Sequence, residues 1–310
     1  MNNSKVSKAF APAAISSFFE IHETEGNKPI ADLEKMGARG GGFGLQKGVS
    51  TEIAVKEAES TSVKVFINSM PAPEAKTTIK VVETLLREVE GNHEVTVHHQ
   101  IEVPIGTGFG TSAGGALTAG LALKAALDLP LTFNQIGRIA HVAEIQCQTG
   151  LGTVSSLVST GGCVLVVEPG APGICQLDRI PISSDYIIVA GFFQSQMPKT
   201  LCAERKQTIN RYGKETLKAI LAEPTLKNFL DRCREFSENV GFATANVRRL
   251  VKLAKDAGAV GSAQNMLGEA VHALVLKERA EEVAEAFKRV LPPEKVLMSK
   301  IDFQGVRLVE

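Results

Sequence analysis

A run of alternating glycines directly before a stretch of strong helix formers constrains this chain more than any other feature. Gly106, Gly108 and Gly110 lie in the segment IGTGFGTSAGG, and residues 117–127 follow with alanine, leucine and no proline. Glycine lets the backbone take positive φ and approach a ligand closely. Free N–H groups and the positive end of the helix dipole favour an anion at a helix N-terminus, so this segment predicts a phosphate-binding loop.

Hydroxyl side chains close the predicted loop. Thr111 and Ser112 can cap the helix or contact a metal ion. A glycine-rich turn that only caps a core helix is the alternative, but the Thr-Ser-Ala-Gly continuation before a helix favours phosphate binding. The residues expected to bind the phosphates are Pro104, Gly106, Thr107, Gly108, Phe109, Gly110, Thr111, Ser112, Ala113 and Gly114.

Length and composition exclude several classes of protein. A chain of 310 residues exceeds a comfortable single core, so we expect two domains, at 1–183 and 184–310. Lys plus Arg and Asp plus Glu number 34 each, which argues against a nucleic-acid surface. Five scattered cysteines without a C-x-x-C pair indicate reduced thiols in the cytoplasm. No apolar run approaches the ~18 residues of a membrane span, and the sequence allows a homodimer without determining the oligomeric state.

The spacing of apolar residues predicts a mixture of strands and helices. Strands are expected at 8–23 with a turn at Pro12, and at 50–58, 61–68, 94–103, 163–168 and 186–193; helices are expected at 74–89, 117–127 and 133–148. Residues 149–162 are expected to form a loop and a turn. Helices at 208–257 are followed by a glycine-containing motif at 258–268, a strand, a charged helix and a final strand pair at 296–309. This second half is typical of an α+β domain.

Residues 37–48 contain six glycines together with Arg39 and Lys47. Two interpretations are open: a flexible hairpin tip, or a mobile loop that lines a site and presents a cation to an anion. On another expected strand, His98 and His99 are neighbours. They should therefore point to opposite faces and not form a metal-binding pair.

Arg138, His141 and Glu144 are spaced by three residues on an expected helix that Thr132 can cap, so they lie along one side of it. A carboxylate beside small apolar residues needs a partner, because an unpaired buried charge is costly. The partner is either one of the two neighbouring side chains or a metal ion shared with Ser112. Mg²⁺ takes one or two protein oxygens together with phosphate oxygens and water, which suits the second arrangement.

Three motifs in this order resemble those of the GHMP kinases. Ala11-Pro12-Ala13 resembles the family's first motif, residues 104–113 resemble its Pro-x-x-x-Gly-x-Gly-Ser-Ser-Ala phosphate loop, and residues 258–268 resemble its third, glycine-rich motif. Within this family, the archaeal pantoate kinases are the branch that the chain resembles most. The segments that carry this closer resemblance are 37–49, 106–123 and 258–274.

The resemblance implies an α+β, two-domain GHMP kinase fold. Its N-terminal domain would be a ribosomal-protein-like α/β domain with a left-handed βαβ phosphate loop, and its C-terminal domain a ferredoxin-like α+β domain. The implied activity is ATP-dependent phosphorylation of the 4-hydroxyl of pantoate in coenzyme A biosynthesis, with ATP and Mg²⁺ as cofactors. Ser112 falls on the family serine that contacts Mg²⁺ and phosphate, and Glu144 falls on its metal-binding glutamate.

Two departures from the family pattern leave the catalytic base unidentified. Mevalonate-kinase-like members carry an Asp after the glutamate helix, but residues 150–156 contain no carboxylate. The lysine often found in the first motif is also absent, because Ala14 or Ile15 occupies that place. Phosphoryl transfer through a loose transition state depends mainly on positioning and charge neutralisation, so the missing base is chemically tolerable.

The carboxylate of a small hydroxy acid requires a cation, and the planar fork of arginine suits it best. Arg39 is the first choice, and His141 and His22 are reserves for proton handling. The family resemblance implies that the third motif, around Gly261 to Asn265, supports the phosphate loop and borders the acceptor. The residues expected to border or bind the acceptor are Arg39, Arg138, Lys199, Arg205, Gly261, Ser262 and Asn265. Homoserine, mevalonate or shikimate remain alternative acceptors. A non-catalytic sensor that binds ATP and a metabolite is the alternative from a different class.

Overall fold

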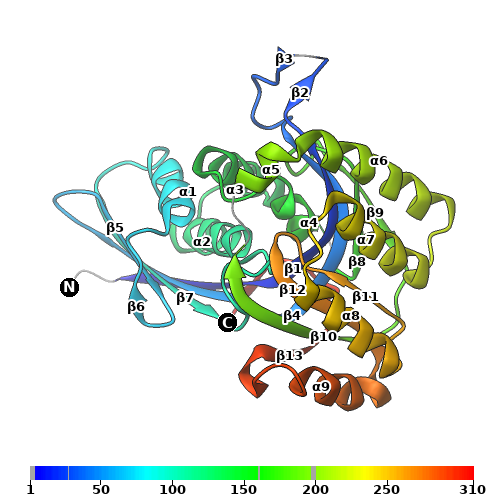
Figure 1. Cartoon of the computed structure of the whole chain (residues 1–310). Coiled ribbons are helices and arrows are strands. Elements are labelled where there is room, and N and C mark those ends of the chain that lie inside the picture. Colours follow the sequence, from blue (N-terminus) through cyan, green and yellow to red (C-terminus); the bar gives the residue numbers. More distant parts are fainter. Residues whose placement is uncertain (1–3, 27, 160, 197–199) are drawn as a thin grey trace.

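The computed structural model describes residues 4–26, 28–159, 161–196 and 200–310. Two β-sheets and the helices that cover them make up the body, from which a small β2–β3 hairpin projects (Figure 1). The first sheet has the strand order β14-β1-β4-β7-β5-β6, with β8 paired to β4 and β9 paired to β8. Its strands are β1 (Lys5–His22), β4 (Gly37–Glu57), β5 (Ser62–Ile67), β6 (Met70–Pro71), β7 (His93–Ile101), β8 (Cys163–Glu168), β9 (Gln176–Ile180) and β14 (Arg307–Val309).

The second sheet is antiparallel and has the order β11-β12-β10-β13. Its strands are β10 (Tyr186–Gln196), β11 (Gly261–Gln264), β12 (Gly268–Leu276) and β13 (Val296–Lys300), and the projecting hairpin is β2 (Thr24–Glu25) with β3 (Lys28–Pro29). The helices are α1 (Lys76–Leu86), α2 (Thr111–Leu127), α3 (Phe133–Cys147), α4 (Thr153–Ser159), α5 (Thr200–Glu204), α6 (Lys206–Ala222), α7 (Leu226–Val240), α8 (Ala245–Asp256) and α9 (Ala280–Lys288).

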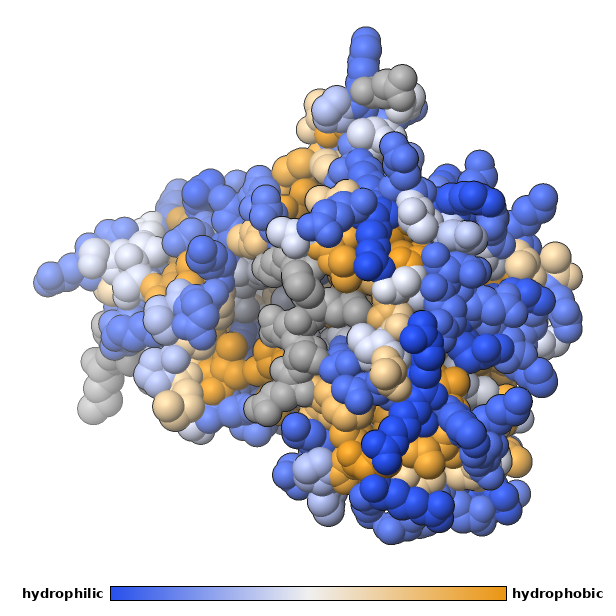
Figure 2. Space-filling view, viewed as in Figure 1, coloured by the Kyte–Doolittle hydropathy of each residue, from blue (hydrophilic) through white to orange (hydrophobic). Residues whose placement is uncertain are grey.

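The core joins the two sheets into one body. Helix α2 packs on β1 and β4, while α7 packs against both β1 and β11. The Phe229 ring of α7 lies edge-on to Phe18 of β1 and Phe43 of β4, with ring centroids 6.2 and 5.4 Å apart. Such aromatic pairs stabilise a core beyond the area that they bury. The outward faces of α6 and α9 are hydrophilic (Figure 2), as amphipathic helices at a surface should be.

Several sequence predictions are confirmed. Strand β8 covers the predicted residues, and α3 begins after Thr132, whose hydroxyl accepts a hydrogen bond from the Gln135 N–H. On β7, His98 is exposed and His99 is buried, so the two rings point to opposite faces. Among the described residues, no helix is both long and apolar enough to cross a membrane.

The prediction of a loop at residues 37–48 is wrong, because this segment is the first half of β4. Its glycines permit close approach of two strands rather than flexibility. A Cβ on Gly42 would lie 1.6 Å from the Ile15 carbonyl oxygen, and one on Gly48 would lie 2.1 Å from that of Ala11. The turn predicted at Pro12 is also wrong, since β1 continues through it with only a shift in pairing register.

Two further expectations fail for reasons that lie beyond local sequence. Helix α4 occupies part of the expected loop at 149–162, and its Val154 and Leu157 are buried in the core between the first sheet and its helices. The two strands predicted to pair at 296–309 lie in different sheets. Strand β13 pairs with β10 in the second sheet, whereas β14 pairs with β1 in the first. All strands of the second sheet fall within residues 186–300, and a domain division at 183/184 stays a prediction.

Candidate active site

The glycine-rich loop turns sharply before α2. Gly106, Gly108 and Gly110 take φ values of 81°, 84° and 64°, a region that side chains other than glycine rarely adopt. Space also demands glycine, because a Cβ on Gly110 would lie 2.9 Å from the Ala14 carbonyl oxygen. Gly110 is the N-cap of α2 and offers no side chain to the first-turn N–H groups. These groups are therefore suited to an anion, and the loop fits a phosphate chain.

Strand β1 and the turn after β11 both pack against this loop. The Ala14 N–H donates to the Phe109 carbonyl oxygen at 3.0 Å, and the Phe109 ring is buried. A Cβ on Gly268 would lie 2.4 Å from the carbonyl oxygen of Thr107, so the turn and the loop are in close contact. Strand β1, which carries the first motif, and the third motif thus both contact the second motif.

A serine and a buried glutamate meet at the start of α2. The Ser112 hydroxyl donates to Oε1 of Glu144, on α3, at 2.5 Å. Glu144 is 2% exposed, and burial raises the pKa of its carboxyl group, opposed by hydrogen bonds from Ser112 and Thr149. No ion pair among the described residues includes Glu144. The carboxylate is therefore held by hydroxyl groups and lacks a cation.

The neighbouring charged residues of α3 do not neutralise Glu144. Arg138 donates from Nε to the Pro172 carbonyl oxygen and lies 3.6 Å from a Glu34 oxygen. His141 is buried, and its Nε2 lies 3.0 Å from the Met36 carbonyl oxygen. Burial lowers the pKa of His141 despite the nearby carbonyl oxygens, so the ring is neutral near pH 7. The structure brings Ser112 and Glu144 together and directs these two side chains elsewhere.

Residues just after α3 enclose the carboxylate, and the sequence did not single them out. A Cβ on Gly150 would lie 2.3 Å from Glu144 Oε2, so any side chain there would displace the carboxylate. The Thr149 hydroxyl lies 2.9 Å from that of Thr77 on α1. The adjacent pair Thr149-Gly150 directly after a helix is a visible signal, but its contact with Glu144 depends on where the helix ends.

The site has oxygen atoms that could bind a phosphate-bound magnesium ion. Over the described ranges, no group of three or more His, Cys, Asp or Glu residues is placed to hold a metal. Ser112 and Glu144 provide two oxygens beside the phosphate-binding loop. Mg²⁺ commonly binds one or two carboxylates and completes its shell with substrate phosphates and water, so these residues fit it.

Arg39, the first choice for the acceptor carboxylate, is occupied by contacts within the protein. Its Nε donates to the Val167 carbonyl oxygen at 3.1 Å. Its Nη1 lies 3.3 Å from Glu20 Oε1, and its Nη2 lies 2.8 Å from Glu168 Oε2. All three nitrogens thus have partners, but Nη1 and Nη2 each carry a second N–H group. The role of Arg39 as a substrate ligand stays a prediction.

The remaining acceptor candidates lie in separate places. Arg205 donates to the Val240 carbonyl oxygen at 2.8 Å and stacks over the Phe242 ring. Lys199 lies outside the described residues. In the third motif, Gly261 faces Leu230 of α7, whereas Asn265 packs against Gly108 of the loop. Ser262 is buried in β11.

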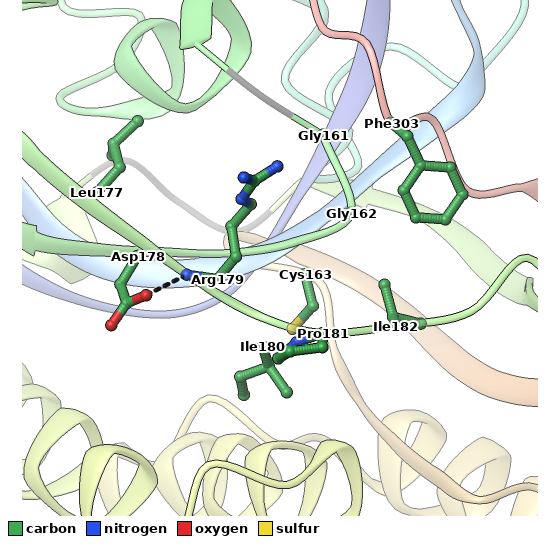
Figure 3. Close-up of a pocket in the computed structure, with 10 residues that line it drawn as sticks. All are labelled: Gly161, Gly162, Cys163, Leu177, Asp178, Arg179, Ile180, Pro181, Ile182 and Phe303. Carbon is green, nitrogen blue, oxygen red and sulfur yellow. Dashed lines mark hydrogen bonds between the residues drawn. The ribbon is translucent and has the colours of Figure 1, made fainter.

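A surface hollow of about 640 Å³ is lined by other residues, which are drawn in Figure 3. It is formed by the turn before β8, by β9 and by the segment between β13 and β14. Its lining residues are Gly161, Gly162, Cys163, Leu177, Asp178, Arg179, Ile180, Pro181, Ile182 and Phe303. None of the predicted site residues lines it, so the candidate site is defined by the loop and Glu144 rather than by this hollow.

Comparison with known proteins agrees with this geometry. Residues 76–161 match the GHMP kinases N terminal domain. The pantoate kinase of Thermococcus kodakarensis is 31% identical over 288 residues, covering 90% of each chain, and that of Methanocaldococcus jannaschii is 28% identical, covering 90% of this chain and 96% of the relative. A solved phosphotransferase related to the CoA biosynthesis pathway superposes with a TM-score of 0.84 at 27% identity over 98% of both chains.

Proposed function

Because this chain belongs to the GHMP kinases, within the pantoate kinase family, we propose that it transfers the γ-phosphoryl group of ATP to the 4-hydroxyl of pantoate. The product would be 4-phosphopantoate, a step toward coenzyme A. The observation that carries the proposal is the contact between Ser112 and the buried, cation-free Glu144 beside a glycine loop at the N-terminus of α2. A core helix has no need of such an arrangement, whereas a kinase that binds nucleotide with Mg²⁺ does.

In this proposal, the backbone N–H groups of residues 106–114 hold the triphosphate, and Ser112 and Glu144 provide oxygens to Mg²⁺. Bound magnesium neutralises charge on the phosphate oxygens. Glu144 is confined by Gly150 and accepts hydrogen bonds from Ser112 and Thr149, so its carboxyl group is held in place beside the loop. Rigid placement of this kind lowers the barrier mainly through orientation.

The acceptor hydroxyl does not require a strong base in this arrangement. The polar side chains of residues 150–156 are serine and threonine hydroxyl groups. The His141 Nε2 atom forms a hydrogen bond with the Met36 carbonyl oxygen. In a loose transition state the attacking hydroxyl carries little charge, so in-line placement contributes more than proton removal. Arg39 and His141 stay predicted acceptor-side residues.

The test is an ADP-release assay with pantoate, homoserine, mevalonate and shikimate, with phosphorus NMR to identify the product. Pantoate should give the highest kcat/KM, and the phosphate should appear on its 4-hydroxyl. A higher kcat/KM with another acceptor would overturn the substrate assignment. Tight ATP binding without turnover on any acceptor would instead favour a sensor of metabolite and nucleotide.

A further inference from the structure

Ser17 lies at an irregularity of β1 that redirects its side chain. Ser16 pairs with Gly42 and Phe18 pairs with Gly41, so Ser17 is an extra residue in the ladder between β1 and β4. Bulges of this kind bend a strand and change the direction of one side chain. Ser17 is completely buried, and its hydroxyl lies 3.0 Å from Nε2 of His272 on β12, in the other sheet.

His272 connects this bulge to the third motif. Its Nδ1 lies 2.9 Å from Oδ1 of Asn265, and the ring is completely buried. Because an amide oxygen only accepts, Nδ1 carries the proton and Nε2 accepts from the Ser17 hydroxyl. Burial lowers the pKa of His272 to about 3, so the ring stays neutral and this hydrogen-bonding direction is maintained at ordinary pH.

Asn265 is the residue of the third motif that contacts the phosphate-binding loop. A Cβ on Gly108 would lie 2.9 Å from Asn265 Cβ, so the two residues are in van der Waals contact. The turn is tied to β1 a second time, since the Met266 N–H donates to the Ser16 carbonyl oxygen at 2.7 Å. In the part of the chain that the structure describes, the buried Nδ2 of Asn265 has no partner. An unpaired buried amide is costly, so this N–H group is suited to one further acceptor at this corner.

We propose that His272 is a positioning residue for ATP binding: by orienting the Asn265 side chain, it fixes the turn against Gly108 and so sets the shape of the phosphate-binding loop. The inference rests on the proposed function, because it takes the loop to be the ATP site. The role in nucleotide affinity is thus given to a side chain of the second sheet, whereas the loop follows β7 of the first sheet. His272 itself would not contact the ligand.

Two substitutions of His272 separate this role from simple stability. The amide of His272→Asn reaches the place of Nδ1 and retains the bond to Asn265, whereas the longer side chain of His272→Gln reaches the place of Nε2 and retains only the bond to Ser17. Each variant loses one hydrogen bond and part of the ring volume. We expect similar losses of thermal stability, but an ATP·Mg²⁺ dissociation constant raised about tenfold only in His272→Gln.

His99→Gln is a matched control. This second buried histidine contacts the Thr51 and Thr78 hydroxyl groups and has no bond to Asn265. It should lower stability without changing the dissociation constant of ATP. If the His272 variants fail to fold, Asn265→Ala provides the test, since it leaves His272 and Ser17 in place and should weaken ATP binding about as much as His272→Gln.

Binding is measured by calorimetry without acceptor, which separates this inference from the identity of the substrate. Equal ATP affinities in His272→Asn and His272→Gln, or equal weakening in His99→Gln, would overturn it, as would unchanged binding in Asn265→Ala. A wild-type protein that binds no ATP would overturn both proposals. A protein that binds ATP but does not phosphorylate pantoate would contradict only the proposed function.

Discussion

Two charged centres of the first sheet and its helices differ in how their charge is balanced. In the part of the chain that the structure describes, the Glu144 carboxylate is buried beside hydroxyl groups and forms no ion pair with a basic side chain. At Arg39 a guanidinium lies between Glu20 and Glu168, and each of its three nitrogens has an acceptor. The charge of Glu144 is not balanced by a basic side chain among the described residues, whereas the charge of Arg39 is balanced by two carboxylates. The missing counter-charge, rather than the presence of charge, distinguishes a binding site from a structural contact.

The difference follows from the elements that carry these residues. Arg39 and Glu20 are direct partners in the register of β4 and β1, so they form a cross-strand ion pair. Glu144 instead faces the first turn of another helix, and its side-chain partners among the described residues are hydroxyl groups. Substitutions at the two centres should therefore have opposite effects on activity and stability.

The largest effect is expected for Glu144→Gln. The variant keeps the shape of the side chain but removes the charge that would hold Mg²⁺, so kcat/KM should fall by roughly 10²–10³-fold. The free energy of unfolding should stay the same or rise, because an uncompensated buried charge is removed. Enzyme assays over a range of Mg²⁺ concentrations and thermal denaturation check both parts. Unchanged turnover with unchanged Mg²⁺ dependence would show that the metal assignment is wrong.

Ser112→Ala should have the next largest effect. It removes one proposed metal ligand and the hydrogen bond that holds Glu144 Oε1, and kcat/KM should fall by about 10–100-fold. Ser112→Thr, which restores the hydroxyl group, is the control and should recover much of the activity. Equal activity of the alanine and threonine variants would exclude a role for the hydroxyl.

The Mg²⁺ concentration that the enzyme needs for activity should depend on pH through Glu144. Burial raises the pKa of Glu144, so a proton competes with Mg²⁺ more strongly as the pH falls. Activity at limiting Mg²⁺ should therefore decline on acidification and be restored by excess Mg²⁺. Without metal, the raised pKa also means that stability declines as the pH rises above 4.5, the ordinary pKa of a glutamate, and Glu144→Gln should abolish this decline. A metal requirement that is constant with pH would contradict this account.

The smallest effect on activity is expected for Glu20→Gln, the matched substitution at the second centre. It weakens a partly buried ion pair with Arg39, so the free energy of unfolding should fall by about 1 kcal/mol. Turnover should stay within about threefold of the wild type. Arg39→Lys provides the critical test of the comparison: a KM for pantoate raised more than tenfold would show that Arg39 binds the substrate and that the second centre is not merely structural.

The site was predictable where its chemistry is local. Alternating glycines before a helix and a Thr132 cap before the next helix predicted the loop and α3, and both are present. The pairing of Ser112 with Glu144 was expected as a shared metal site, from the need of a buried carboxylate for a partner and from the family pattern, whereas their direct hydrogen bond was not predicted. By contrast, the glycines of residues 37–48 suggest flexibility when read alone, and only the neighbouring strand explains them. The partners of Arg39 and the position of α4 depend on packing between distant segments, for which no local signal exists.

Strand β14 has a consequence for any attempt to separate the two halves of the protein. It pairs with β1 at residues 8–10, and Arg307 also stacks on the Phe10 ring, with 4.5 Å from the guanidinium to the ring centroid. A fragment cut at residue 183 would therefore leave the backbone of β1 as an uncovered sheet edge. Uncovered edges recruit strands from other molecules, so such a fragment should aggregate. The strand that completes the first sheet lies beyond the second sheet in the chain, so residues 1–183 do not contain the whole of the first sheet.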